Sequence, residues 1–165
     1  MGNVNISITN VPTVISAIED LKRRCIDAVR DATEEAGDTL RDKARANFQG
    51  SHPSGFPHVG GDRPNWVSGQ LAQSITAWPL VQEGPYRFMV QVNPTTVYSR
   101  IIELGGTIVP RQAQYLSWFS PYMGRQMFKR SVTLRGWPYL RPATEEMITD
   151  MLPIFERHML EAWHA

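Results

Sequence analysis

Apolar residues recur at steps of three and four positions between residues 13 and 49, the longest periodic stretch of the chain. This spacing predicts one long amphipathic helix. Ser16 and Glu19 can form a capping box near its start, and Gly50 is suited to ending it. Gly37 inside the pattern indicates a bend. The stripe is rich in alanine, which allows another element to pack close to it: Ile18, Leu21, Cys25, Val29, Ala32, Ala36, Leu40, Ala44 and Phe48.

A second helical pattern follows Pro142 and predicts a C-terminal helix over residues 142–165. Pro153 lies inside this pattern and is expected to kink or divide the helix, because proline removes a backbone donor and crowds the preceding turn. The residues at helical spacing are Ala143, Met147, Met151, Phe155, Met159 and Trp163.

Between the two helices, residues 68–141 hold short alternating segments that are typical of strands. A hairpin is expected around Glu83-Gly84-Pro85, and the segments TIV, YLSWF and SVTLRG predict further strands. A short helix is expected over 97–104, closed by Gly105. Residues 50–67 are rich in glycine and proline, which predicts a long irregular loop of a kind that often carries function.

These elements predict an α+β fold in which the long N-terminal helix and the C-terminal helix pack on an antiparallel sheet of about four to five strands. The whole chain, residues 1–165, is expected to be one domain. Its parts are an N-terminal arm (1–12), the long helix (13–49), the Gly/Pro-rich loop (50–67), the sheet with a projecting basic hairpin (68–141) and the C-terminal helix (142–165). The N-terminal arm (1–12) alternates polar and apolar residues and could pair as a strand, for instance with another subunit.

The composition places the chain among ordinary globular proteins, with 165 residues, 42% apolar and 20% charged residues. No apolar run approaches the roughly 20 residues that a membrane span needs, and no secretory signal is expected. The net charge of +1 is unevenly distributed. Residues 100–141 contain seven bases and one acid, whereas residues 143–165 contain five acids and one base. Such asymmetry bears on association with partners.

The chain offers few groups for catalysis. Cys25 lies on the apolar stripe of the long helix, where a buried thiol is the simpler interpretation. His52, His58 and Asp62 share the Gly/Pro-rich loop, but their spacing matches no usual metal site. We therefore expect no metal, no cofactor and no enzymatic activity. His158 and His164 are expected on nearly opposite faces of the C-terminal helix.

The stretch from Tyr115 to Arg141 interleaves aromatic and basic residues, as stacking on bases combined with phosphate neutralisation would require. The alternation fits a sheet with aromatics on one face and arginines on the other at least as well. Within this stretch, SPYMGRQMFKR (120–130) predicts a hairpin tip with three bases and no acid, which reaches toward an acidic protein or a nucleic acid.

Four segments in order resemble the tail-completion and virion-morphogenesis proteins of tailed bacteriophages. They are SGQLAQSI (68–75), VYSRIIELGGTIVP (97–110), YLSWF (115–119) and RGWPYLRPATEE (135–146), and the resemblance spans roughly residues 36 to 160. Leu104 and Ser99 depart from the family pattern, as does the Gly-Trp-Pro of 136–138. The positions that carry the motif are Ser68, Gly69, Leu71, Ser74, Glu103, Gly105, Gly106, Pro138, Leu140 and Pro142.

The resemblance implies a structural protein of the virion, in the head–tail neck or the upper tail, that assembles in the host cytoplasm. It implies a ring of identical subunits, six being the expected number, with tail-tube and head-closure proteins as partners. In such a ring, the basic segment of one subunit can contact the acidic helix of its neighbour. The expected interface residues, toward a neighbour or the DNA channel, are Arg111, Arg125, Lys129, Arg130, Arg135, Glu145, Glu146 and Asp150. The alternative is a nucleic-acid-binding module that uses residues 100–141.

Overall fold

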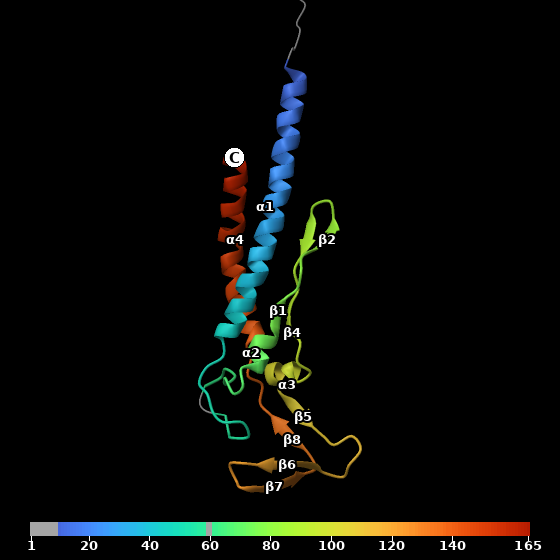
Figure 1. Cartoon of the computed structure of the whole chain (residues 1–165), viewed down its shortest axis with the longest axis vertical. Helices are drawn as coiled ribbons and strands as arrows, with labels where there is room; N and C mark the ends of the chain where they lie inside the picture. Colours follow the sequence, from blue (N-terminus) through green and yellow to red (C-terminus); the bar gives the residue numbers. More distant parts are fainter. Residues whose placement is uncertain (1–9, 59–60) are drawn as a thin grey trace, which may run out of the picture.

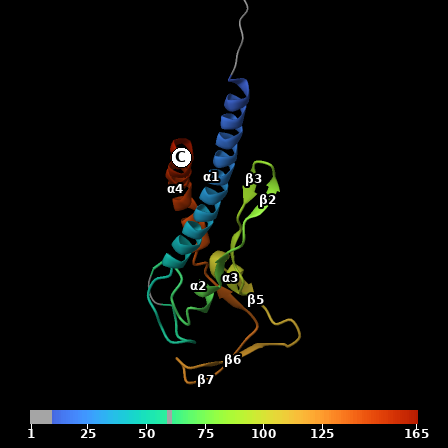
Figure 2. The same ribbon diagram turned by 45° about the horizontal axis from the view of Figure 1, so that its top comes forward.

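The computed structural model describes residues 10–58 and 61–165 of an elongated molecule, with two long helices at one end, one β-hairpin beside the first of them, and further β-ladders at the other end (Figure 1). Helices α1 (Val11–Ala46) and α4 (Leu140–His164) lie side by side in opposite directions. Helix α1 extends past the C-terminal end of α4 (Figures 1 and 2). We call this pair the helical arm. The mixed α+β class is confirmed.

Small side chains bring the two helices of the arm together. The buried residues of the pair are Ala28, Ala32 and Ala44 on α1 with Ala143 and Met147 on α4. Alanine at these positions lets the helix axes approach closely, as the alanine-rich stripe predicts. On α4 only the first part of the predicted stripe is buried: Met151 is 45% and Trp163 65% exposed. Helix α4 also continues through Pro153.

Helix α1 begins at Val11, with proline in its first turn, and it needs no capping box at Ser16. It runs unbroken through Gly37, where a Cβ atom would lie too close to the side chain of Val90. The reason for this glycine is therefore the close approach of the neighbouring hairpin. The helix ends at Ala46, earlier than predicted, and Gly50 lies in the following loop with a φ of 66°.

The strands are antiparallel but do not form the single sheet of four to five strands that the sequence predicts. They form four separate two-stranded ladders. The hairpin around Gly84 is confirmed, in two parts: β1 (Ile75–Ala77) pairs with β4 (Val92–Pro94), and β2 (Val81–Gly84) pairs with β3 (Arg87–Met89). The residues around Pro79 interrupt it, because proline cannot donate to a ladder.

The remaining strands form two ladders farther from the arm. Strand β5 (Gly106–Ile108) pairs with β8 (Val132–Leu134), and β6 (Leu116–Ser120) pairs with β7 (Arg125–Lys129). The β6–β7 ladder, which we call the ribbon, lies at the end of the molecule opposite the arm (Figure 1). Its turn comprises residues 121–124, so Arg125 and Lys129 lie on strand β7 and not in the hairpin tip that the sequence predicts.

Two short helices, α2 (Gln70–Ser74) and α3 (Ser99–Leu104), lie between the arm and the outer ladders (Figure 1). The guanidinium of Arg45 on α1 donates to the carbonyl oxygens of Ala72 and Ile75, at 3.2 and 2.8 Å, and so ties the end of α2 to α1. The described part of the Gly/Pro-rich loop holds no helix or strand, as predicted. Its base is closed by backbone bonds from Gln49 to Pro64 and from Trp66 to Gly50, both 2.9 Å long.

Candidate assembly interface

Three of the four motif segments identified in the sequence meet at one place in the structure. The core cluster consists of Ala44, Ile75, Tyr139 and Ala143, and Leu71, Ile102 and Leu140 pack against it. Residues from the segments 68–75, 97–110 and 135–146 therefore meet around Tyr139, which is fully buried. We call the part formed by residues 103–106 and 136–141 the junction.

Glu103 fixes the start of α4 at the junction. One carboxylate oxygen accepts hydrogen bonds from the backbone N–H groups of Tyr139 and Leu140 at 2.7 and 3.1 Å, and the other accepts one from Arg141 at 2.9 Å. These are orphan donors of the helix N-terminus, and a negative charge there also suits the helix dipole. Pro142 follows in the first turn, where a missing N–H group costs nothing.

The glycines of the junction allow two backbone segments to touch. Gly105 has a φ of 71°, and a Cβ atom on it would lie 2.6 Å from the backbone nitrogen of Gly136. A Cβ atom on Gly136 would lie 2.8 Å from the carbonyl carbon of Leu104. The N–H of Trp137 donates to the carbonyl oxygen of Ile102 at 2.7 Å and fastens the crossing. The double glycine therefore serves packing and chain direction.

The remaining motif positions surround α2. Gly69, with a φ of 73°, precedes the helix, and the hydroxyl of Ser68 accepts a 3.3 Å bond from the N–H of Gln70. The hydroxyl of Ser74 donates to the carbonyl oxygen of Leu71 at 2.7 Å. Each of these contacts shapes the α2 turn. The motif residues thus build the scaffold, and the candidate interface lies elsewhere.

The ribbon exposes aromatic residues that no other part of the described chain covers. The pairing of Ser117 with Phe128 and of Phe119 with Gln126 puts Phe119 and Phe128 on one face, where they are 59% and 63% exposed. On the opposite face Leu116 and Met127 are half-buried, whereas Trp118, Arg125 and Lys129 are exposed. A two-stranded ladder is at best marginally stable alone. The ribbon therefore presents an exposed aromatic face at the end of the molecule.

The basic residues predicted for an interface are exposed, but they do not all have the same surroundings. Among the described residues, Arg111, Arg125 and Lys129 form no ion pair. The guanidinium of Arg130 lies 5.9 Å from the ring centroid of Tyr115, within reach of a cation–π contact. Arg135 pairs with Asp62 of the Gly/Pro-rich loop. The free bases thus lie on the ribbon and on the segment that leads to it.

The acidic residues predicted for the same interface are used within the chain. Glu146 and Asp150 lie 3.6 and 2.8 Å from the ammonium group of Lys43, so they help to join α4 to α1. Glu145 pairs with Arg141 one turn away on α4. All three acids are on α4, which lies away from the β6–β7 ribbon of the same chain (Figure 1).

A second ion-pair group joins the arm nearer its free end. The carboxylate of Glu35 accepts hydrogen bonds from Arg157, and His158 lies 2.9 Å away. The hydrogen bond from the Arg157 guanidinium is the main reason why the pKa of the Glu35 carboxyl lies below its usual value. The hydrogen bond with His158 lowers this pKa further, by a smaller amount. Arg24 donates to the carbonyl oxygen of Ala162 at 2.9 Å. These contacts set the register of α4 on α1.

The charge of the molecule is separated along its length. The helices α1 and α4 together carry 13 acids and nine bases, whereas residues 47–139 carry three acids and eight bases. The arm thus has a net charge of −4 and the remainder of the chain +5. Opposite poles on one molecule favour head-to-tail contact between copies.

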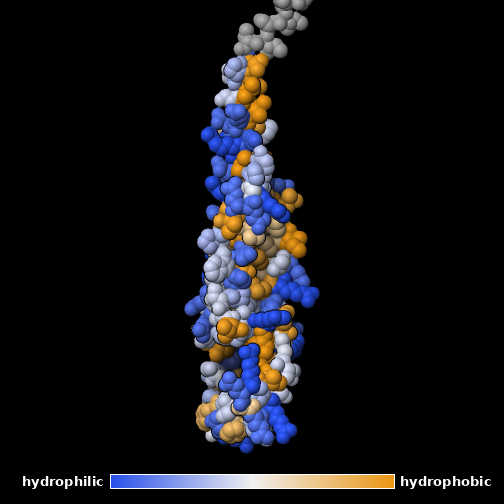
Figure 3. Space-filling view, turned by 90° about the vertical axis from the view of Figure 1, so that its right-hand side faces the viewer, coloured by the Kyte–Doolittle hydropathy of each residue, from blue (hydrophilic) through white to orange (hydrophobic). Residues whose placement is uncertain are grey.

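Large apolar side chains also remain uncovered on the arm. Val14, Ile15 and Ile18 on the free end of α1 are at least half exposed, as are Ile148 and Leu152 on the outer side of α4. Figure 3 shows apolar side chains along the length of this narrow view, including the N-terminal end of α1. Only eight hydrophobic residues in the described part of the chain are buried, and five of them are alanines.

Groups for metal or thiol chemistry are not brought together. Within residues 10–58 and 61–165, no three His, Cys, Asp or Glu side chains gather where they could hold a metal ion. Cys25 is half-buried on α1 beside Tyr86 and Phe88. None of the described helices is both long and apolar enough to cross a membrane.

Comparison of the chain with models of known protein families, with curated proteins and with solved structures gives no significant match. The functional argument therefore depends on the geometry and the charges described above.

Proposed function

We propose that this protein is a structural subunit of a tailed-bacteriophage virion, which forms a ring of identical copies in the head–tail neck or at the top of the tail. The expected ring has six subunits and contacts tail-tube and head-closure proteins. The ring joins these virion proteins through complementary surfaces, without catalysis. The observation that carries this proposal is the large apolar surface that one chain leaves uncovered.

The total accessible surface of the chain exceeds that of a compact monomer of the same mass, which supports assembly into an oligomer. The accessible surface of the chain is 11914 Å². A compact monomer of 18.7 kDa would have about 8,300 Å² by the usual scaling of surface with mass. The difference exceeds the roughly 1,600 Å² that two standard interfaces would cover on one subunit of a ring. Large apolar side chains are exposed on this surface, among them Ile18, Phe128 and Ile148.

The separation of charge supports contact between unlike surfaces of neighbouring copies. The ribbon carries bases without acids, and the helical arm has an excess of acids. A contact between different surfaces on identical subunits is heterologous, and it closes into a ring when the rotation between copies is suitable. A two-fold dimer would instead bring like surfaces together.

The unpaired bases also favour a second function, binding of nucleic acid in the channel of the ring or independently of it. Arg125 and Lys129 lie on the same face of the ribbon as Trp118, whose ring is 37% exposed, and Arg111 lies in the segment that leads to the ribbon. Such a surface could neutralise phosphates and stack on bases. We place this second because the exposed apolar side chains on the helical arm and the excess acids there have no role in it.

The mass of the purified protein, alone and mixed with tail-tube protein, tests the proposal. We expect a defined oligomer or co-assembly with tail-tube rings, and weak DNA binding. A strictly monomeric protein that never joins a virion fraction would contradict the structural role. Binding to short duplex DNA with an affinity that falls by several powers of the salt concentration would favour the second function.

A further inference from the structure

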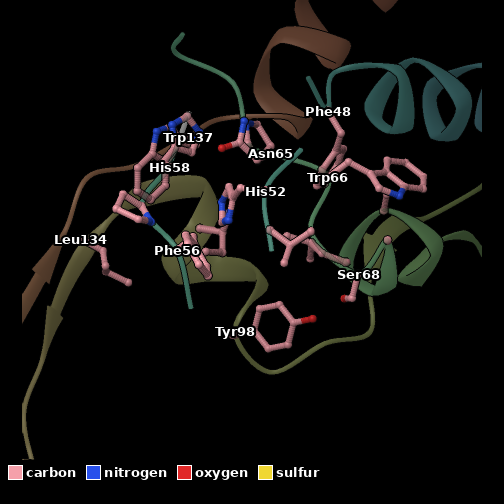
Figure 4. Close-up of a pocket in the computed structure, with 17 residues that line it drawn as sticks. Phe48, His52, Phe56, His58, Asn65, Trp66, Ser68, Tyr98, Leu134 and Trp137 are labelled. Atoms are coloured by element: carbon pink, nitrogen blue, oxygen red, sulfur yellow. The ribbon is translucent and has the colours of Figure 1, made fainter. Parts of the chain in front are cut away.

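A cavity of about 410 Å³ opens between the Gly/Pro-rich loop, α2, α3 and the chain near Trp137 (Figure 4). Its size is within the range of about 300–1,000 Å³ that is common for binding pockets. Seventeen residues line it, and none of them is Asp, Glu, Lys or Arg. The cavity therefore suits an uncharged group.

Aromatic rings form the walls of this cavity. The imidazole of His58 stacks on the indole of Trp137 with ring centroids 4.5 Å apart, and Phe48 meets Trp66 edge to face at 6.1 Å. Tyr98 and Phe56 also line the cavity (Figure 4). The polar edge of His58 is occupied, since its Nε2 atom lies 2.9 Å from the carbonyl oxygen of Arg63. Such walls favour an aromatic ring, which can stack or meet them edge on.

The chain itself carries an exposed pair of aromatic rings. Phe119 and Phe128 are diagonal neighbours on the outer face of the ribbon, and we call them the aromatic knob. They are more exposed than the apolar residues on the other face of the same ribbon. The knob and the cavity are thus an uncharged projection and an uncharged hollow on one molecule.

We propose that the aromatic cavity receives the knob of a second copy of this chain. This inference rests on the proposed ring, for which it names the contact between neighbours. The ribbon's own turn already lies against the cavity rim, where Tyr122 meets Phe56 at 5.6 Å. The knob of the same chain lies outside the cavity and does not line it. Because knob and cavity are different surfaces, each copy can use both at once, as a head-to-tail ring requires.

Two variants and their mixture test the contact. Ser68→Phe fills the cavity from the position at its edge in Figure 4, and Ser68→Ala is the matched control that leaves it open. Phe119→Ser with Phe128→Ser removes the knob. Tyr86→Ser, at a side chain as exposed as that of Phe128 (63%), is the matched control for loss of a surface ring. Circular dichroism and thermal unfolding establish that each variant is folded, and sedimentation velocity over a concentration series measures association.

We expect wild-type protein and both controls to associate, and the filled and knobless variants each to remain monomeric. Mixed together, these two variants should form a 1:1 dimer and nothing larger, because the mixture contains one intact knob and one open cavity per pair. Association of either folded variant as in wild type, or failure of the mixture to form a dimer, would overturn the inference while wild-type assembly still supports the ring. A wild-type protein that stays monomeric at every concentration would count against the ring itself and the inference with it.

Discussion

The junction around Tyr139 and the β6–β7 ribbon are both rich in aromatic residues, yet one chain completes only the first. At the junction Tyr139 is fully buried, and Glu103 accepts three backbone hydrogen bonds that begin α4. On the ribbon, the rings of Phe119 and Phe128 are more than half exposed, and the nearby bases have no acid of the same chain beside them. The difference indicates that the junction holds the subunit together, whereas the ribbon leaves an aromatic surface exposed, as the proposed contact with a second copy requires.

Tyr139→Ala should have the largest effect on the folded subunit. Removing a fully buried ring from the core leaves a cavity beside Phe48 and Ile75, and we expect a loss of about 3–5 kcal/mol in the free energy of unfolding. Urea unfolding followed by circular dichroism measures it. Phe128→Ala on the ribbon is the comparison, and it should change the stability of the monomer by less than about 0.5 kcal/mol. Equal losses for the two variants would remove the distinction between the regions.

Glu103→Ala should have the next largest effect, because it leaves three N–H groups at the start of α4 without their acceptor. We expect a loss of about 2 kcal/mol in the free energy of unfolding, within the range for charged hydrogen bonds and helix caps. Glu103→Gln keeps one acceptor oxygen and should lose less. Glu145→Ala, an exposed acid on the same helix, is the control and should be nearly neutral. A neutral result for Glu103→Ala would show that the cap does not hold α4 in place.

Reversing Arg125, Lys129 and Arg130 to glutamate should affect association and leave the fold almost unchanged. The three side chains are exposed, so the free energy of unfolding of the monomer should change by less than about 0.5 kcal/mol. Repulsion from the acidic arm of a neighbour should weaken assembly, measured by sedimentation velocity. If the variant unfolds, the ribbon belongs to the structural core and the contrast with the junction is wrong.

The ion pair between the helices of the arm should give the smallest effect, visible as a dependence on pH. The folded state lowers the pKa of the Glu35 carboxyl, so its contribution to stability is present above the ordinary glutamate pKa of about 4.3. It is lost as the pH falls through the lower, folded value. We expect the difference in stability between wild type and Glu35→Gln to shrink from pH 6 to pH 3. A difference that stays constant over this interval would exclude a role for the ionised carboxylate.

The helices could be predicted from the sequence more fully than the strands, for a physical reason. The alanine-rich stripe of α1 is a local pattern with a period that only a helix satisfies, and its alanines Ala28, Ala32 and Ala44 are buried, although α1 packs mainly on α4 and not on the predicted sheet. Alternation within TIV or YLSWF predicts a strand but not the strand it pairs with. The single sheet was therefore wrong: each pair closes on its own and leaves its edges open.

The candidate interface, too, could be predicted from the sequence only in part. The basic excess of the ribbon is visible in the sequence, but the use of Glu146 and Asp150 by Lys43 depends on how α4 lies against α1. The aromatic cavity is also invisible in the sequence, because His58 and Trp137 are far apart in the chain and meet only in the fold. A cluster of aromatic residues and glycines in the loop 50–67 was the one available signal.

Hydrogen–deuterium exchange, measured on the free monomer and on the assembled protein, distinguishes the junction from the ribbon. We expect slow exchange at Tyr139, Leu140 and Arg141 in both states, since their amides are bonded to Glu103. We expect fast exchange of the β6–β7 amides in the monomer and strong protection after assembly. Ribbon amides that are as protected as the junction in the monomer, or still unprotected in the assembly, would contradict this distinction.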